Sequence, residues 1–129
     1  MLACEKFRAN NSLPTTELSA LRDRLRRFAA ERDWDQYHSP KNLAMALIVE
    51  AGELVEHFQW LSESQSTALS AAQRKAVESE IADVLIYLVR LADKLDIDLA
   101  VAATAKMAVN EVRYPADKVR GSARKHDEY

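Results

Sequence analysis

Two pairs of carboxylates stand out because each lies in a stretch of sequence that is otherwise largely apolar. Glu50 and Glu53 belong to "NLAMALIVEAGELVEHFQW", and Glu80 and Asp83 belong to "SEIADVLIYLVRLA". Both pairs are spaced i, i+3, which places the two members on one face of a helix. An ionised carboxylate in apolar surroundings is costly unless a partner neutralises it. The segment "ALIVEAGELVEHFQW" offers no such partner except His57.

A divalent cation is the partner that suits four such side chains best. An all-oxygen set of ligands favours Mg²⁺, with Mn²⁺ as a substitute. Either pair alone would favour the ordinary alternative of solvated charge, but two pairs on the apolar sides of two helices favour a metal site. A di-iron bundle would require Glu-x-x-His motifs. Leu54 stands three positions before His57, and the second stretch contains no histidine.

Apolar residues at helical spacing predict the elements that position these carboxylates. Ser39 and Pro40 are typical of an N-cap followed by proline at the first helical position, and Ser70 with Gln73 is typical of a capping box. Pro115 should stop the last long helix. The expected helices cover residues 15–34, 40–61, 70–95 and 99–114.

A helical wheel over residues 40–61 places Glu50 inside the apolar stripe. Glu53 falls on the shoulder of that stripe, and Glu56 is turned further towards solvent. The stripe itself is formed by Leu43, Leu47, Leu54, Phe58 and Leu61, with His57 and Trp60 beside it. On the next helix, the same exercise groups Glu80, Asp83 and Tyr87 with Val77, Val84 and Leu91.

The composition favours a single all-α domain. The chain has 129 residues with 2 glycines and 3 prolines, so long helices are favoured over tight turns. We expect a flexible leader over residues 1–14, the domain over 15–115 and a polar C-terminal tail over 116–129. A net charge of −2 gives no reason to expect a nucleic-acid polymer as partner, and no apolar run suggests a membrane. The single cysteine, Cys4, and the absence of a signal segment favour a cytoplasmic location.

Four segments together resemble the MazG-like superfamily of all-α nucleoside triphosphate pyrophosphatases, and within it the dCTP pyrophosphatase branch. They are "FAAERDWDQYHSPKNL", "EAGELVEHFQW", "SEIADVLIYLVRLA" and "KMAVNEVRYP". The resemblance implies a four-helix-bundle-like protomer with long antiparallel helices, assembled as a homotetramer, with a dimer as the alternative. It also implies Mg²⁺-dependent hydrolysis of dCTP, or of a 5-modified dCTP, to dCMP and pyrophosphate.

The resemblance assigns roles to individual residues. The metal ligands would be Glu50, Glu53, Glu80 and Asp83. The nucleotide would be held by Trp34, His38, Trp60 and Tyr87. The branch often has a histidine in the first helix at the base pocket, where Leu25 stands here. This departure bears on the preference for one base over another and not on the chemistry.

Further candidates come from the spacing of charged side chains. Lys106, Asn110 and Arg113 recur at i, i+4 and i+7, followed by Tyr114, and one helical face would present them to a triphosphate. The tail residues Arg120, Arg124 and Lys125 could close over the phosphates. The attacking water would be activated either by contact with the metal or by a glutamate acting as base, with Glu53 as the first candidate for the base and Glu56 as the reserve.

Two alternative functions fit the same sequence. The first is an enzyme of the same superfamily that prefers dUTP or accepts many nucleoside triphosphates. The second is a non-catalytic helical interaction module, in which the carboxylates form salt bridges between subunits. A nucleotide panel separates the first alternative from a dCTP pyrophosphatase. Stabilisation by Mg²⁺ and dCTP would exclude the second.

Overall fold

The computed structural model describes residues 15–128, which contain helices and no strand. The long helices are α1 (Glu17–Glu31), α2 (Pro40–Glu56), α4 (Ala71–Lys94) and α5 (Leu99–Arg113). The short ones are η1 (Asp35–Tyr37), α3 (Glu63–Ser66), α6 (Ala116–Val119) and η2 (His126–Glu128). The predicted all-α fold is therefore confirmed. The leader expected over residues 1–14 lies outside the described residues.

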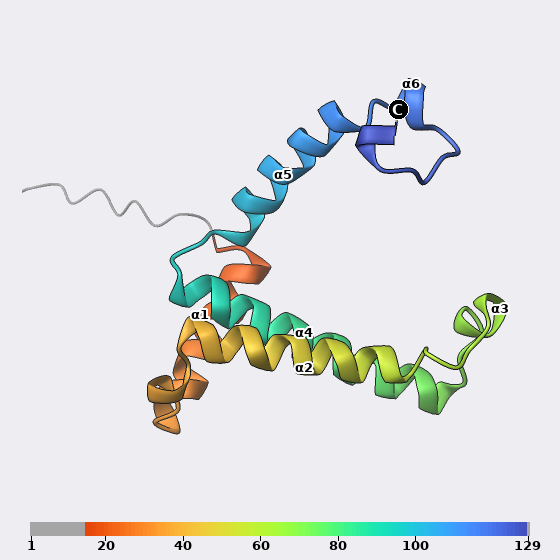
Figure 1. Ribbon diagram of the computed structural model, residues 1–129. Helices are drawn as coiled ribbons and strands as arrows, with labels where there is room; N and C mark the ends of the chain where they lie inside the picture. Colours follow the sequence, from red (N-terminus) through yellow and green to blue (C-terminus); the bar gives the residue numbers. More distant parts are fainter. Residues whose placement is uncertain (1–14, 129) are drawn as a thin grey trace, which may run out of the picture.

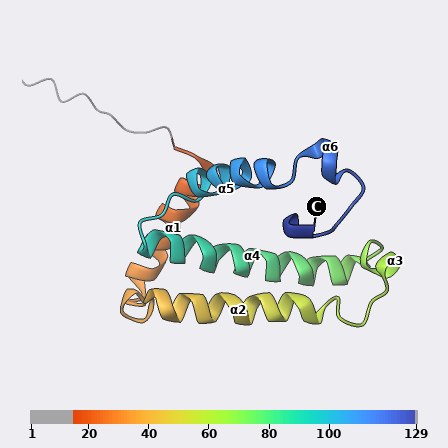
Figure 2. The same cartoon turned by 45° about the horizontal axis from the view of Figure 1, so that its top comes forward.

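Helices α2 and α4 form an antiparallel pair joined through α3 at one end (Figures 1 and 2). Helix α1 packs against α4. The side chains buried most fully are Ala29, Leu43, Val77, Val89 and Ala92, together with Arg90. No helix between residues 15 and 128 is long and apolar enough to cross a membrane.

Side-chain caps start the long helices at the expected places. The hydroxyl of Ser39 accepts a hydrogen bond from the backbone N–H of Asn42, with Pro40 at the first helical position. Ser70 and Gln73 form the predicted capping box at the start of α4. Both starts are thereby confirmed, because a cap satisfies backbone N–H groups that have no partner within the helix.

The end of α2 differs from the prediction. The expected helix continued to Leu61, but α2 ends at Glu56. The backbone N–H of His57 donates to the carbonyl of Leu54, and that of Phe58 donates to the carbonyl of Val55 at 2.9 Å. These i→i−3 bonds tighten the last turn and redirect the chain. Residues 57–60 therefore form a turn and do not extend the face of the helix.

Helices α1 and α4 end in the same way, with an aspartate in the left-handed region of backbone conformation. Asp33 and Asp96 both have φ of 54°, which aspartate tolerates better than most residues. After α1, the N–H of Trp34 donates to the carbonyl of Ala29 at 2.9 Å. This bond closes a Schellman-type cap. The expected helix over residues 15–34 consequently stops at Glu31, and the cap turns Trp34 back beside α1.

Helix α5 extends away from the α2/α4 pair (Figure 1). Its side chains from residue 100 to residue 113 are all exposed. The apolar ones include Val101, Met107 and Val112, which are 65%, 62% and 80% exposed. Three of the four long helices thus pack together within one chain, and the fourth leaves an apolar surface uncovered.

Candidate active site

Three of the predicted metal ligands meet between α2 and α4. Glu50 projects from α2, and Glu80 and Asp83 project from α4; one ligand oxygen of each lies within 4.8 Å of the others. All three side chains are half-buried. The Glu80 Oε2 atom is buried and has no hydrogen-bond partner among residues 15–128. Glu80 Oε1 lies 3.6 Å from His57 Nε2.

The electrostatics of this cluster suit a divalent cation. Burial raises the pKa of Glu50, and its hydrogen bond and repulsion with Glu53, together with the charges of Asp83 and Glu80, raise it further. No lysine or arginine within the described part of the chain forms a salt bridge with Glu50, Glu80 or Asp83. Three mutually repelling carboxylates and an unpaired buried oxygen form a hard, all-oxygen donor set, which is the type that Mg²⁺ and Mn²⁺ prefer.

The other two predicted glutamates are less enclosed. Glu53 is exposed and lies outside the group of three, although its carboxyl is close enough to Glu50 to raise the pKa of that residue. Glu56 is the exposed last residue of α2. Both stay predictions, Glu53 as a fourth ligand or a base and Glu56 as the alternative base.

A cavity of about 450 Å³ opens between α1, the segment that carries η1, and α4. This volume is in the range of ordinary small-molecule sites. Its lining combines Leu21, Arg24, Leu25, Phe28, Ala29, Trp34, His38, Asp83, Ile86, Tyr87 and Arg90. Three of the residues predicted to hold the nucleotide, Trp34, His38 and Tyr87, thus share one cavity. Asp83 belongs both to this cavity and to the carboxylate cluster.

An aromatic pair forms one wall of this cavity. The ring of Phe28 meets that of Trp34 edge to face, with centroids 5.7 Å apart and planes inclined at 70°. The guanidinium of Arg32 lies 3.7 Å from the centroid of Phe28. Trp34 is 45% exposed, so a flat ligand has access to its ring. The place of Phe28 beside Trp34 depends on the turn after α1 and is a feature of the fold.

The remaining predicted binding residues lie away from the cavity within one chain. Trp60 is in the turn after α2 and is 85% exposed. Lys106, Asn110 and Arg113 are exposed on α5, and Tyr114 caps the end of that helix. The tail cations Arg120, Arg124 and Lys125 lie beyond α6 and are exposed. The roles assigned to these residues stay predictions.

A network of ion pairs beside the cavity was missed by the sequence analysis. Arg90 is only 4% exposed. It donates to Asp35 at 3.0 Å and to Asp93 at 3.3 Å. Arg26 forms a bidentate salt bridge with Asp93, and Lys94 donates to Asp35 at 2.5 Å. The sequence did contain one indication of a buried ion pair: Arg90 is the sole charged residue of the apolar stretch "VLIYLVRLA".

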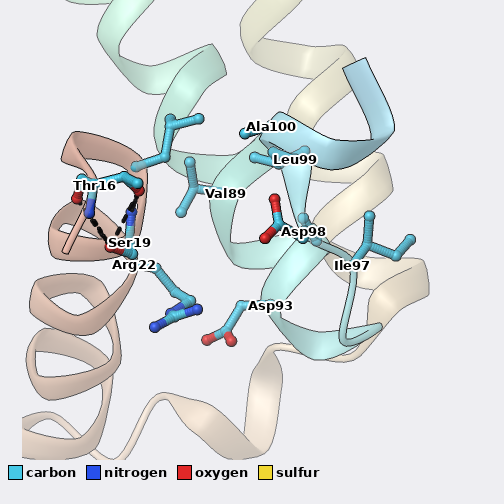
Figure 3. A pocket seen from close by; sticks show the side chains of 11 residues that line it. Thr16, Ser19, Arg22, Val89, Asp93, Ile97, Asp98, Leu99 and Ala100 are labelled. Carbon is cyan, nitrogen blue, oxygen red and sulfur yellow. Dashed lines mark hydrogen bonds between the residues drawn. The ribbon is translucent and has the colours of Figure 1, made fainter. Parts of the chain in front are cut away.

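A second, smaller cavity of about 90 Å³ lies where α1, α4 and the start of α5 meet (Figure 3). Thr16 and Ser19 at its edge hydrogen-bond to each other. Asp93 in its wall is already held by two arginines. The polar groups around this cavity are therefore engaged, and it is too small for a nucleotide.

Comparison with known proteins decides the family. A model described as the MazG-like family matches residues 45–128. The protein called dCTP pyrophosphatase 1 from Homo sapiens is 45% identical over 117 residues, covering 89% of this chain and 69% of that protein. The chain belongs to the MazG-like family.

Further relatives agree with this membership. The dCTP pyrophosphatase 1 of Rattus norvegicus is 46% identical over 115 residues, which covers 88% of this chain and 68% of that MazG-like relative. A crystal structure of a pyrophosphatase from Archaeoglobus fulgidus is 41% identical and superposes with a TM-score of 0.74. That match covers 80% of this chain and 96% of the archaeal chain. The family suggested by the four sequence segments is thereby confirmed.

Proposed function

We propose that this MazG-like chain is a nucleoside triphosphate pyrophosphatase that hydrolyses dCTP to dCMP and pyrophosphate. The observation that carries the proposal is the position of Asp83, which belongs both to the carboxylate cluster and to the wall of the cavity with Trp34 and His38. A nucleotide whose base lies beside the aromatic pair would therefore have its α-phosphate near the carboxylates. The relatives named dCTP pyrophosphatase 1 support the same substrate and reaction.

The chain's own residues account for binding and activation. Trp34 offers a ring on which a base can stack. Tyr87 lies one helical turn from Asp83 and also lines the cavity, so it can contact the sugar. A Mg²⁺ ion held by Glu50, Glu80 and Asp83, with Glu53 as a fourth ligand, would neutralise charge on the phosphates. Glu53 is exposed and is our first candidate for accepting a proton from water, with Glu56 as the reserve.

We infer that the active protein is a homo-oligomer, with a tetramer favoured over a dimer. The support is the exposed apolar surface of α5, which one chain leaves uncovered. Large uncovered apolar surfaces mark interaction sites. Assembly would also allow Lys106 and Arg113 on α5 of one chain to approach the phosphates bound by another. A cytoplasmic location, where free nucleotides are available, is part of the same proposal.

The test is release of pyrophosphate from a panel of nucleoside triphosphates with and without Mg²⁺. We expect the highest kcat/KM for dCTP and loss of turnover when the metal is chelated. Equal or greater activity on dUTP would instead support the alternative of a dUTP or broad-specificity enzyme. No turnover of any nucleotide, together with no thermal shift by Mg²⁺ and dCTP, would overturn the proposal in favour of an interaction module.

A further inference from the structure

Arg90 of α4 connects the interior of the fold to the segment that carries the predicted base-binding residues. Besides its ion pairs with Asp35 and Asp93, its guanidinium contacts His38. Arg90 Nε lies 3.4 Å and its terminal nitrogen NH2 lies 3.3 Å from His38 Nδ1. Both contacts join residues 52 positions apart in the sequence. They hold the imidazole at the edge of the nucleotide cavity.

The chemistry of arginine decides which nitrogen of His38 carries the proton. A guanidinium has five N–H donors and no acceptor. The nitrogen that faces Arg90 must therefore be the unprotonated acceptor, so the ring proton resides on Nε2. The charges around the ring agree with a neutral imidazole. Burial lowers the pKa of His38, as do Arg90 and Lys94 of α4, while Asp35 of η1 opposes them.

The other face of the ring is available to a ligand. His38 lines the 450 Å³ cavity together with Trp34, and its Nε2 makes no hydrogen bond within residues 15–128. Leu25 lines the same cavity and offers no polar group. The imidazole of His38 is thus an oriented donor next to the ring on which a base would stack.

We propose that Arg90 is a positioning residue that holds His38 with its Nε2–H directed at the base, so that the pocket selects cytosine over uracil. The inference rests on the proposed function and extends it to base selection. Cytosine presents acceptors at N3 and O2, whereas uracil carries an N–H donor at position 3. If the Nε2–H of His38 faces the N3–H of uracil, neither of these two donors has an acceptor. Sites built around one hydrogen bond reject ligands that cannot make it.

The first experiment compares Arg90→Gln with Lys94→Gln. Both variants remove a hydrogen bond to the same Asp35 carboxylate, but only Arg90 also contacts His38. We expect Arg90→Gln to lower the ratio of kcat/KM for dCTP to that for dUTP by about tenfold, chiefly through KM for dCTP. Lys94→Gln should keep the wild-type ratio. An equal fall in both variants would show that anchoring of the loop is what matters, and would overturn the inference.

A second variant remains informative if Arg90→Gln does not fold. In His38→Asn, the side-chain oxygen can accept from Arg90 in place of Nδ1, but nothing occupies the position of Nε2. We expect the same loss of the dCTP to dUTP ratio with an unchanged melting temperature. A ratio equal to that of the wild type would contradict a donor at Nε2.

The tautomer itself can be measured without any turnover. In protein labelled with ¹⁵N-histidine, the wild type at neutral pH should show His38 with a bare Nδ1 and a protonated Nε2. A proton on Nδ1, or a doubly protonated ring, would overturn the inference even in an active dCTP pyrophosphatase. Absence of dCTP hydrolysis with the expected tautomer would instead reject the proposed function, so the two failures are distinguishable.

Discussion

At the scale of single residues, the carboxylate cluster differs from ordinary surface charge in its burial and in its lack of partners. Glu80 has one oxygen buried without a hydrogen-bond partner among the described residues, and the pKa of Glu50 is raised by burial and by its acidic neighbours. Such a cluster is destabilising for the metal-free protein. This is consistent with carboxylates that serve to bind a ligand and do not stabilise the fold.

The variant Glu80→Gln tests this interpretation. We expect it to reduce pyrophosphate release from dCTP at least a hundredfold, because a neutral amide is a poor ligand for Mg²⁺. Its melting temperature without metal should equal or exceed that of the wild type, since one repelling charge disappears. Glu78→Gln is the matched control, because Glu78 is 65% exposed on the same helix. Activity near that of the wild type in Glu80→Gln would remove Glu80 from the metal site.

The two tryptophans should differ in their response to nucleotide. Trp34 lines the cavity, and Trp60 is 85% exposed outside it. Trp34→Ala should weaken binding by about 1–3 kcal/mol, equivalent to a roughly 5- to 150-fold rise in KM for dCTP. Trp34→Phe should retain most of the affinity, because a ring remains.

Fluorescence gives an independent check. In a Trp60→Phe variant, Trp34 is the one tryptophan left in the chain, and a non-hydrolysable dCTP analogue should change its emission. In the reciprocal Trp34→Phe variant, a change at Trp60 would require a second chain to bring that ring to the ligand. An unchanged signal from Trp34 at saturating ligand would show that it has a structural role.

At the scale of elements, the ends of helices and the ion pairs between them position the site. The cap after α1 turns the chain so that the ring of Trp34 meets that of Phe28 edge to face. Asp93 near the end of α4 then joins α1 through Arg26, and Arg90 joins the η1 segment through Asp35. The cavity therefore has walls from three elements that are connected by ion pairs, in each of which a buried charge of α4 meets an exposed partner.

Asp93 makes the stability of this arrangement dependent on pH. The hydrogen bond from Arg26 holds the pKa of Asp93 below its ordinary value of 3.8, and burial opposes this effect. The folded state thus favours the charged form, and the stabilisation is present above pH 3.8 and lost as the pH falls through the folded pKa. Asp93→Asn should lower the free energy of unfolding at pH 7 by about 2 kcal/mol.

Urea unfolding at several pH values measures both effects. The deficit of Asp93→Asn relative to the wild type should be constant above pH 3.8 and shrink below it, because the carboxylate of the unfolded wild type takes up its proton there, whereas the folded state, with its lowered pKa, does so only at lower pH. Asp96→Asn is a suitable control, since Asp96 is exposed and asparagine tolerates the same backbone conformation. A deficit that is constant with pH would contradict the role of the Asp93 charge.

At the scale of the whole molecule, the apolar surface of α5 is the feature that one chain leaves unexplained. Val112 is 80% and Met107 is 62% exposed. Val112→Glu should weaken assembly, because a charge would be buried at the contact, and it should reduce activity in parallel. Glu111→Gln next to it should change neither, since it adds no charge.

Analytical ultracentrifugation with activity assays at several protein concentrations provides the measurement. The wild type should sediment as a species larger than a single chain. Val112→Glu should dissociate at low concentration and regain activity when concentrated. A wild type that is fully active as a single chain would contradict the assembly. It would also show that Lys106 and Arg113 are ordinary surface charges and do not contact phosphates bound by another chain.

Features that depend on short-range chemistry could be predicted from the amino-acid sequence. The i, i+3 carboxylates on apolar faces, the caps at Ser39 and Ser70, and the all-α class follow from periodicity and from backbone groups that neighbouring side chains satisfy. These signals span a few residues and remain the same whatever packs around them. The helix α2 was nevertheless expected to be one turn too long, because the apolar pattern continues past its real end.

Which of these side chains share a site depends on how the helices pack and could not be predicted from the sequence. Asp83 belongs both to the carboxylate cluster and to the wall of the 450 Å³ cavity because α1 and α2 pack on the same helix, α4. Arg90 meets His38 and Asp35 across 52 and 55 residues of sequence. Contacts over such separations depend on the packing of whole helices, and no local pattern encodes them. For the same reason, the separation of α5 from the site within one chain emerged from the fold alone.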